Sequence, residues 1–147
     1  MRIRVTKIFT FEMAHALKNY DGLCRNIHGH SYTLYVTVSG EPVIDRSSAK
    51  LGMVVDFGDL KKLVYDIIIN RYDHALLLQK GHENELLSEE SCRSMKILKT
   101  DFQPTSEMMV GHFAEILIDS LPHHLSLEKL KLYETANSYA EWLKSDQ

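Results

Sequence analysis

A cysteine and two histidines lie close together in the segment Cys24-Arg-Asn-Ile-His28-Gly-His30. Residues two apart in an extended segment point to the same face, so His28 and His30 could bind one ion without distorting the chain. Gly29 between them lets a backbone or a ligand approach closely. A third histidine, His15, lies at the far end of the same loop and would come near the pair if the flanking strands form a hairpin-like unit. Three neutral imidazoles suit Zn²⁺ and leave a fourth position open, which is typical of a catalytic zinc site.

The alternative is that these are polar loop histidines on the surface, which is the better explanation for any single histidine. A His-Gly-His pair beside a cysteine, downstream of another histidine, favours zinc instead. For Cys24, the spacing fits a fourth zinc ligand and a proton-carrying thiolate equally well, since nearby zinc and histidines favour a reactive thiolate. A small buried apolar residue is a third interpretation of Cys24.

Asp73-His74 follows the first expected helix and offers a second candidate for proton transfer. Histidine is the side chain best suited to move protons near neutral pH, and an adjacent acid could tune it. The sequence by itself favours an exposed polar turn at this position.

Two glutamates could bind a ligand. Glu134 shares the strand parity of Leu130 and Leu132, so it would point to the buried side, where a carboxylate needs a partner. A ligand with two adjacent donors, such as an aminopyrimidinone edge, would satisfy it; escape of the side chain to solvent at the strand end is the alternative. Glu107 lies in the first turn of the second helix, where stabilisation of the helix dipole accounts for it.

Periodicity supplies the elements that would position these residues. Alternation predicts half-buried strands, and a stripe of apolar residues with helical spacing predicts helices. Asp56 is the expected N-cap of the first helix, and Pro104-Thr105 begins the second, which ends at Pro122. The order predicts an α+β fold with two helices on one face of a four-stranded antiparallel sheet. The expected strands are 2–11, 31–39, 127–134 and 138–143. The expected loops are 14–29, 40–51 and 79–103, and the last of these leaves room for a short helical piece.

Composition limits the classes of protein to consider. The chain has 147 residues, 44% hydrophobic and 25% charged, which fits one globular domain over residues 1–147. The net charge of −3 and the scattered Lys and Arg residues argue against nucleic-acid binding. No apolar stretch predicts a signal peptide or a membrane span. Two cysteines without disulfide-like spacing fit a reduced, cytoplasmic protein.

The chain resembles the 6-pyruvoyltetrahydropterin synthase / 6-carboxytetrahydropterin synthase family. Six motifs in the family's order cover nearly the whole chain, and together they are highly specific, although any one alone would be weak. They are Phe11-Glu-Met-Ala-His15, Cys24-x3-His28-Gly-His30, Gly52-Met-Val-Val-Asp56-Phe57, Tyr72-Asp73-His74, Pro104-Thr105-Ser-Glu107 and Tyr133-Glu134-Thr135.

The resemblance implies the tunnelling fold, in which the four-stranded sheets of three subunits close into a barrel and two trimers usually stack into a hexamer. It implies a zinc enzyme acting on dihydroneopterin triphosphate, with an active site between subunits. The implied roles differ by residue. His15, His28 and His30 would bind zinc, Cys24, Asp73 and His74 would transfer protons, and Glu107 and Glu134 would bind the pterin ring.

The spacing of Cys24 and the His-Gly-His pair resembles the bacterial branch of the family, because the animal-type enzymes have a longer segment there. That branch makes 6-carboxytetrahydropterin, releases acetaldehyde and triphosphate, and feeds queuosine biosynthesis. The chain departs from the bacterial pattern at residues 79–103, which are longer. Two alternatives are formation of 6-pyruvoyltetrahydropterin at the same site and a zinc-stabilised pterin-binding module without turnover.

Overall fold

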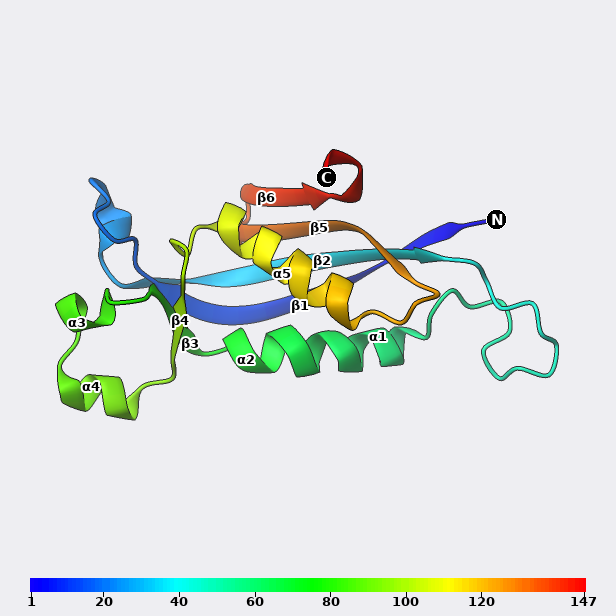
Figure 1. Ribbon diagram of the computed structural model, residues 1–147, viewed down its shortest axis with the longest axis horizontal. Coiled ribbons are helices and arrows are strands. Elements are labelled where there is room, and N and C mark those ends of the chain that lie inside the picture. Colours follow the sequence, from blue (N-terminus) through cyan, green and yellow to red (C-terminus); the bar gives the residue numbers. More distant parts are fainter.

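Six strands form one curled, mixed sheet in the computed structural model, which describes residues 1–147 (Figure 1). Their order across the sheet is β4-β3-β1-β2-β5-β6. Strands β1, β2, β5 and β6 pair antiparallel, whereas β3 pairs parallel with β1 and β4 pairs parallel with β3. The bounds are β1 Ile3–His15, β2 His28–Gly40, β3 Ala75–Gln79, β4 Ile97–Thr100, β5 Ser126–Thr135 and β6 Ser138–Leu143.

The expected four-stranded antiparallel sheet is therefore wrong in its strand number and in being wholly antiparallel. The four expected strands are present, but β3 and β4 extend the sheet beyond β1. Strand β3 shows no alternation because four successive residues, Ala75 to Leu78, are all buried, as is usual for parallel strands. The expectation of a long loop over 79–103 is wrong in missing β4, and the segment holds two short helices, α3 (Glu83–Leu86) and α4 (Glu89–Ser94), where one short helical piece was allowed.

Strands β1 and β2 run farther into the expected loop 14–29 than their alternation indicated. They form one ladder from Ile3 opposite Gly40 to His15 opposite His28. Only residues 16–27 connect them, with a short 3-10 turn at Leu23–Arg25. The polar composition of this region predicted a loop, whereas cross-strand pairing keeps its ends in the sheet.

Both expected helix starts are confirmed. Helix α1 (Phe57–Val64) continues through a π-helical stretch, η2 (Tyr65–Ile69), into α2 (Asn70–Tyr72), and Asp56 accepts a hydrogen bond from the Gly58 N–H at its start. Helix α5 (Ser106–Ser120) begins at Thr105, whose hydroxyl accepts from the Met108 N–H. These caps satisfy backbone donors that have no partner within the helix.

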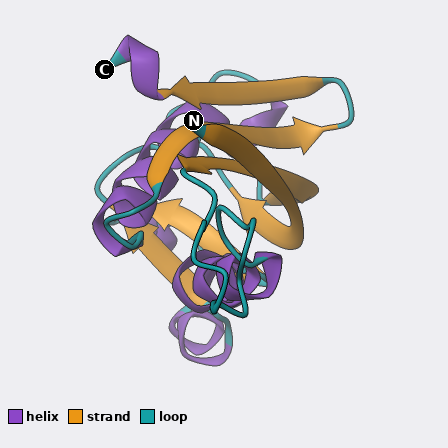
Figure 2. Ribbon diagram, turned by 90° about the vertical axis from the view of Figure 1, so that its right-hand side faces the viewer, coloured by secondary structure: helices purple, strands orange, loops and turns teal.

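The two long helical segments pack on one face of the sheet, as expected. Figure 2, viewed along the long axis, shows them together beside the curved strands. Alternate residues of β1, β2 and β5 meet the apolar stripes of both helices in one continuous core. Its largest members include Phe11, Tyr32, Leu34, Ile68, Met109, Phe113 and Leu132.

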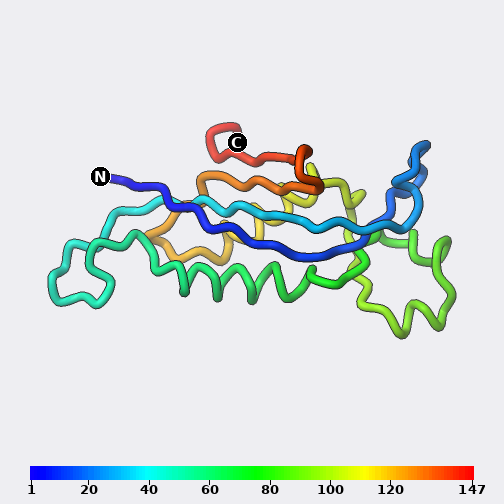
Figure 3. The backbone as a smooth tube through the Cα atoms, turned by 180° about the vertical axis from the view of Figure 1, so that it is seen from behind, coloured from blue at the N-terminus to red at the C-terminus, as the bar shows by residue number.

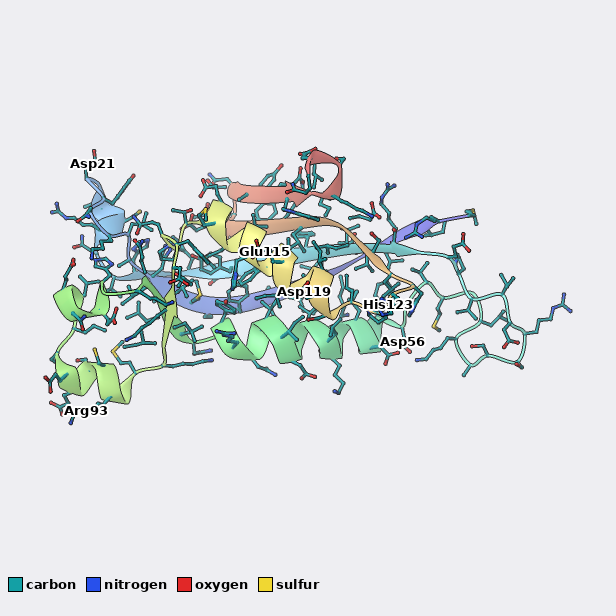
Figure 4. All side chains as sticks on the ribbon, viewed as in Figure 1. Asp21, Asp56, Arg93, Glu115, Asp119 and His123 are labelled. Atoms are coloured by element: carbon teal, nitrogen blue, oxygen red, sulfur yellow. The ribbon has the colours of Figure 1, made fainter.

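The connection 16–27 and the segment with α3 and α4 lie at one end of the molecule, and the N-terminus and residues 41–55 lie at the other (Figure 3). Asp21 and Arg93 mark the first end, and Asp56 and His123 lie toward the second (Figure 4). None of the helices is both long enough and apolar enough to span a bilayer.

Candidate metal centre and proton-transfer residues

Three histidines lie at the junction of β1 and β2 on the helix-covered face of the sheet. His15 is the last residue of β1 and lies directly opposite His28, while His30 lies opposite Met13. All three share the parity of the buried residues of their strands, and His15 is only 1% exposed. Strand geometry thus brings together the three side chains that the sequence proposed as ligands.

The histidine nitrogens converge with a carboxylate from a third strand. Nε2 of His15 lies 3.0 Å from Nε2 of His28. Oε1 of Glu134, from β5, lies 3.2 Å from Nε2 of His15 and 3.0 Å from Nε2 of His30. One donor atom from each of the four residues lies within 4.8 Å of the others. Three imidazoles and one carboxylate are a donor set suited to a divalent transition metal.

The orientation of His30 supports an ion rather than a closed hydrogen-bond network. Its Nε2 is buried and has no hydrogen-bond partner, although the Glu134 carboxylate lies 3.0 Å away. Buried polar atoms are rarely left unpaired, so this nitrogen has a binding capacity that the protein itself does not use. The residues present therefore fit a metal ion.

Backbone carbonyls fix the tautomer of two of the histidines. Nδ1 of His15 lies 2.7 Å from the carbonyl oxygen of Pro104, and Nδ1 of His28 lies 2.7 Å from that of Asn26. A carbonyl can only accept, so each Nδ1 donates its proton and each Nε2 keeps a lone pair for a metal. In many proteins, a hydrogen bond from the second ring nitrogen orients a metal-binding imidazole in this way.

The electrostatics of Glu134 and His30 also favour a metal. The His15 ring beside the carboxylate holds the pKa of Glu134 below its usual range, and a hydrogen bond of 3.1 Å from the Ser106 hydroxyl acts in the same direction. Burial lowers the pKa of His30. Both shifts favour the forms that bind metals, a charged carboxylate and a neutral imidazole.

Gly29 permits the close approach of β1 and β2 at the centre. A Cβ at this position would lie 3.3 Å from the carbonyl oxygen of Met13 on the neighbouring strand. This distance is tighter than ordinary van der Waals contact, so a larger residue would push the His28–His30 segment away from β1.

Cys24 lies in the 3-10 turn shortly before β2 and is not one of the four clustered residues. The side chain is half-buried, and its carbonyl accepts a hydrogen bond of 2.9 Å from the Leu17 N–H. The hydroxyl of Tyr32 is buried without a hydrogen-bond partner. Burial raises the pKa of Tyr32 far above its usual value, and the nearby Glu134 and Cys24 act in the same direction. Cys24 is therefore close to the helix-covered face without completing the metal cluster.

Asp73 and His74 form a pair at the start of β3. Nδ1 of His74 lies 2.9 Å from Oδ2 of Asp73, and Oδ1 of Asp73 accepts a 2.8 Å hydrogen bond from the Glu12 N–H. The backbone of His74 is left-handed, with φ at 58°, and its N–H donates to the carbonyl of Glu12 at 2.6 Å. Few residues other than glycine adopt this conformation, and backbone strain of this kind is often found at functional sites. Although burial opposes it, the Glu12 N–H and the His74 ring together hold the pKa of Asp73 below its ordinary value.

Lys96 anchors this pair from the segment before β4. Its ammonium donates to the carbonyls of Asn70, at 2.9 Å, and Asp73, at 2.7 Å. A cation at the C-terminus of a helix satisfies carbonyls that have no partner within the helix and complements the helix dipole. The chain end of α2 is thereby tied to the sheet edge.

The Asp73–His74 pair does not join the metal cluster of its own chain. His74 is 77% exposed at its side chain. With Lys96 it lines a hollow of about 460 Å³ whose lining also includes residues that alternate with the metal-centre histidines. These alternating residues are Glu12, Ala14, Gly29 and Ser31, and His30 of the cluster lines the hollow as well.

Glu107 lies in the first turn of α5, as the sequence predicted. It is exposed and makes no hydrogen bond or ion pair. Its neighbour Ser106 contacts Glu134, so the first turn of α5 borders the metal centre.

Several supporting residues could not be found from sequence. Pro104 and Asn26 act through backbone carbonyls, which every residue carries, so no residue type could reveal them. Ser106 lies inside a recognised motif, yet its contact with Glu134 depends on how α5 docks on β5. Lys96 lies in the segment for which a loop was expected.

Comparison with known sequences gives extensive matches. The sequence profile of the 6-pyruvoyl tetrahydropterin synthase family matches residues 4–144. A 6-carboxy-5,6,7,8-tetrahydropterin synthase of Haemophilus influenzae is 35% identical over 95% of this chain and 97% of its own length. A Synechocystis protein of the same name is 31% identical over 94% of this chain and 91% of its own length.

Solved structures with the same fold match over nearly all of both chains. An uncharacterised protein from Wolinella succinogenes has a TM-score of 0.78 at 19% identity, covering 98% of this chain and 99% of its own. The 6-pyruvoyl tetrahydropterin synthase of Caenorhabditis elegans has a TM-score of 0.66 at 24% identity, covering 97% and 96%. At these identities the likeness concerns the fold alone.

Proposed function

The chain belongs to the 6-pyruvoyl tetrahydropterin synthase family, and from this membership we propose that it is a zinc-dependent 6-carboxytetrahydropterin synthase. It is an enzyme of the lyase class. The proposed reaction converts 7,8-dihydroneopterin triphosphate and one water molecule into 6-carboxy-5,6,7,8-tetrahydropterin, acetaldehyde and triphosphate. We assign this product to queuosine biosynthesis.

The observation that carries the proposal is the convergence of three histidines and Glu134 at one end of the sheet. His15, His28 and His30 would hold the zinc through Nε2, since two of the three Nδ1 atoms are bound to carbonyls. A zinc ion held by three imidazoles supplies Lewis-acid chemistry to the hydroxyls of the substrate side chain.

Two glutamates would bind the pterin ring. Glu134 points toward the centre from β5, and its lowered pKa keeps it charged, as an acceptor for an aminopyrimidinone edge requires. Glu107 would contribute from the first turn of α5. Binding of the ring at these residues would fix the side chain of the substrate beside the histidines, which is the positioning contribution to catalysis.

Cys24 and the Asp73–His74 pair would carry the protons. As a thiolate, Cys24 would remove the proton from the side-chain carbon next to the pterin ring, and His74 would be the second carrier, held by Asp73. Moving protons in this way reduces the ring and oxidises the side chain, so no nicotinamide is required. In the proposed branch, a carbon–carbon bond then breaks and the triphosphate leaves.

The separation of His74 from the metal centre of its own chain favours a site shared between subunits. The side chain of His74 is exposed just before β3, where it could reach a neighbouring copy. Strand β6 is the last strand of the sheet, so one of its edges is free. The first part of β1 also has a free edge, because β3 pairs with β1 only from Met13 to His15. Open edges are normally paired or protected. We therefore propose a homotrimer, or a hexamer of two trimers, which light scattering can test.

The deciding experiment is incubation with 7,8-dihydroneopterin triphosphate, followed by identification of products by mass. The expected products are 6-carboxytetrahydropterin and acetaldehyde. Formation of 6-pyruvoyltetrahydropterin would assign the chain to the other branch, and binding without conversion would indicate a pterin-binding module. A cytoplasmic location accompanies the proposal, since Cys24 and Cys92 are both free thiols.

A further inference from the structure

We propose that Gln103 is a positioning residue that holds the Cys24 loop, residues 16–27, against the metal centre. The inference rests on the proposed function, because it takes Cys24 as a proton carrier. Gln103 lies at the end of the segment 79–103, for which the sequence suggested no role.

The side-chain amide of Gln103 makes two hydrogen bonds to the backbone of one residue. Its Nε2 donates to the carbonyl of Lys18 at 2.8 Å, and its Oε1 accepts from the Lys18 N–H at 2.9 Å. The amide therefore pairs with Lys18 as a neighbouring strand would. Only an amide side chain combines a donor and an acceptor in this geometry, since a carboxylate lacks the donor and an ammonium lacks the acceptor.

These bonds reach Cys24 through a single further contact. Leu17 precedes Lys18, and its N–H donates to the carbonyl of Cys24 at 2.9 Å. Fixing Lys18 thus fixes the backbone of Leu17 and, through it, that of Cys24. The residues between are mostly exposed, and Asn19 has a left-handed backbone with φ at 58°.

Few other polar contacts hold this loop to the rest of the chain. The Lys18 ammonium lies 2.7 Å from Oε1 of Glu85 on α3, and the Asn26 carbonyl accepts from His28. Glu85 is 53% exposed, so its ion pair is screened by solvent and contributes little. Gln103 is the one side chain beyond His28 that hydrogen-bonds to the backbone of residues 16–27.

The same turn also orients a metal ligand. Pro104 follows Gln103, and its carbonyl accepts from Nδ1 of His15. The N–H of Thr105 donates to the carbonyl of Gln103 at 2.8 Å, which tightens the turn at the start of α5. Gln103 and Pro104 therefore hold the Cys24 loop and the proposed zinc ligand His15 in a fixed relative position. A displacement of about 1 Å in a reacting group can cost roughly 100-fold in rate, so this relative position affects turnover.

The test compares Gln103→Met with the native protein and with Gln147→Met. Methionine keeps the length of glutamine but removes both hydrogen bonds, and Gln147 is an exposed C-terminal glutamine far from the loop (Figure 1). The measurements are zinc per chain, kcat, KM and the rate at which iodoacetamide alkylates Cys24, with Cys92 as an internal reference. The expected result for Gln103→Met is native zinc and KM, a kcat lower by about 10- to 100-fold, and faster alkylation of Cys24 alone.

Native kcat and native alkylation in Gln103→Met would overturn the proposal. Loss of zinc in step with activity would overturn it as well, because the effect would then pass through His15. If Gln103→Met does not fold, Gln103→Glu replaces it and keeps the acceptor while placing a carboxylate oxygen against the Lys18 carbonyl. A native protein that does not convert dihydroneopterin triphosphate would refute the proposed function, and the alkylation rates would still decide whether Gln103 holds the loop.

Discussion

His15 and Pro104 lie 89 residues apart in sequence, and the Nδ1 proton of the histidine is donated to the carbonyl of the proline at 2.7 Å. This one bond joins the end of β1 to the turn that begins α5. It also sets the tautomer of a ring that is 1% exposed, so that Nε2 faces the other donors. The candidate metal centre thus depends on the packing of the fold, because the carbonyl that orients His15 lies at the start of α5.

The first prediction concerns the metal. The purified protein should contain about one zinc per chain, and His28→Ala should lose most of it, since the remaining donors no longer surround the ion. His123→Ala is the matched control, because His123 is exposed near the opposite end of the molecule (Figure 4). Elemental analysis of the three proteins measures the difference, and full zinc in His28→Ala would remove this residue from the ligand set.

The second prediction separates two roles for Glu134, whose carboxylate lies 3.0 Å from Nε2 of His30 and accepts a hydrogen bond from Ser106. Glu134→Gln keeps the size of the side chain but replaces one acceptor oxygen with a donor. If Glu134 binds the pterin ring, zinc should stay and pterin affinity should fall by about 2–5 kcal/mol, as when one partner of a buried charged contact is lost.

Calorimetric titration with a pterin measures the pterin affinity of Glu134→Gln, and elemental analysis measures its zinc content. Glu141→Gln is a suitable control, because Glu141 lies on β6 and pairs with Lys131 instead. Unchanged pterin affinity with lowered zinc would make Glu134 a metal ligand and exclude the binding role proposed here.

Strand parity predicted much of this centre from the sequence. The alternation through Leu130 and Leu132 placed Glu134 on the buried face, and the spacing of His28 and His30 placed both rings on one side. Both statements hold in the structure, because a strand fixes side-chain direction residue by residue. Such local rules need no knowledge of which elements become neighbours.

What the sequence could not supply depends on tertiary contacts. The run Ala75 to Leu78 has no alternation, so the sequence pattern does not identify it as a strand. Its place in the sheet follows from its pairing with β1 on one side and β4 on the other. The amide of Gln103 and the ammonium of Lys96 are ordinary surface groups until the fold places backbone carbonyls beside them. Their partners lie 85 and 23 residues away, beyond the reach of any periodic pattern.

The third prediction concerns pH and Asp73, whose pKa lies below its ordinary value of 3.8 in the folded protein. Because the folded state favours the charged carboxylate, its stabilising contribution is complete above the unfolded pKa and disappears as the pH falls through the folded pKa. Asp73→Asn removes the charge. The native protein should therefore exceed Asp73→Asn in free energy of unfolding at pH 7, and the difference should shrink below about pH 4.

Urea unfolding of both proteins at several pH values measures this difference for Asp73. Asp21→Asn serves as the control, since Asp21 is exposed in the loop between β1 and β2 and forms no ion pair (Figure 4). A difference between native protein and Asp73→Asn that stays constant down to pH 3 would show that the contribution of Asp73 does not depend on its charge.

The last prediction decides between the two roles that spacing left open for Cys24. If Cys24 were a fourth ligand, Cys24→Ala would weaken zinc binding. We expect instead that the variant keeps its zinc and its pterin affinity, because the clustered donors are three histidines and Glu134, with Cys24 outside them. Turnover should fall by roughly 10²–10⁴-fold, the usual cost of losing a positioned acid–base group. Cys92→Ala, which removes the other free thiol, should retain native turnover. Single-turnover assays with elemental analysis test the pair, and loss of zinc together with activity in Cys24→Ala would assign Cys24 to the metal.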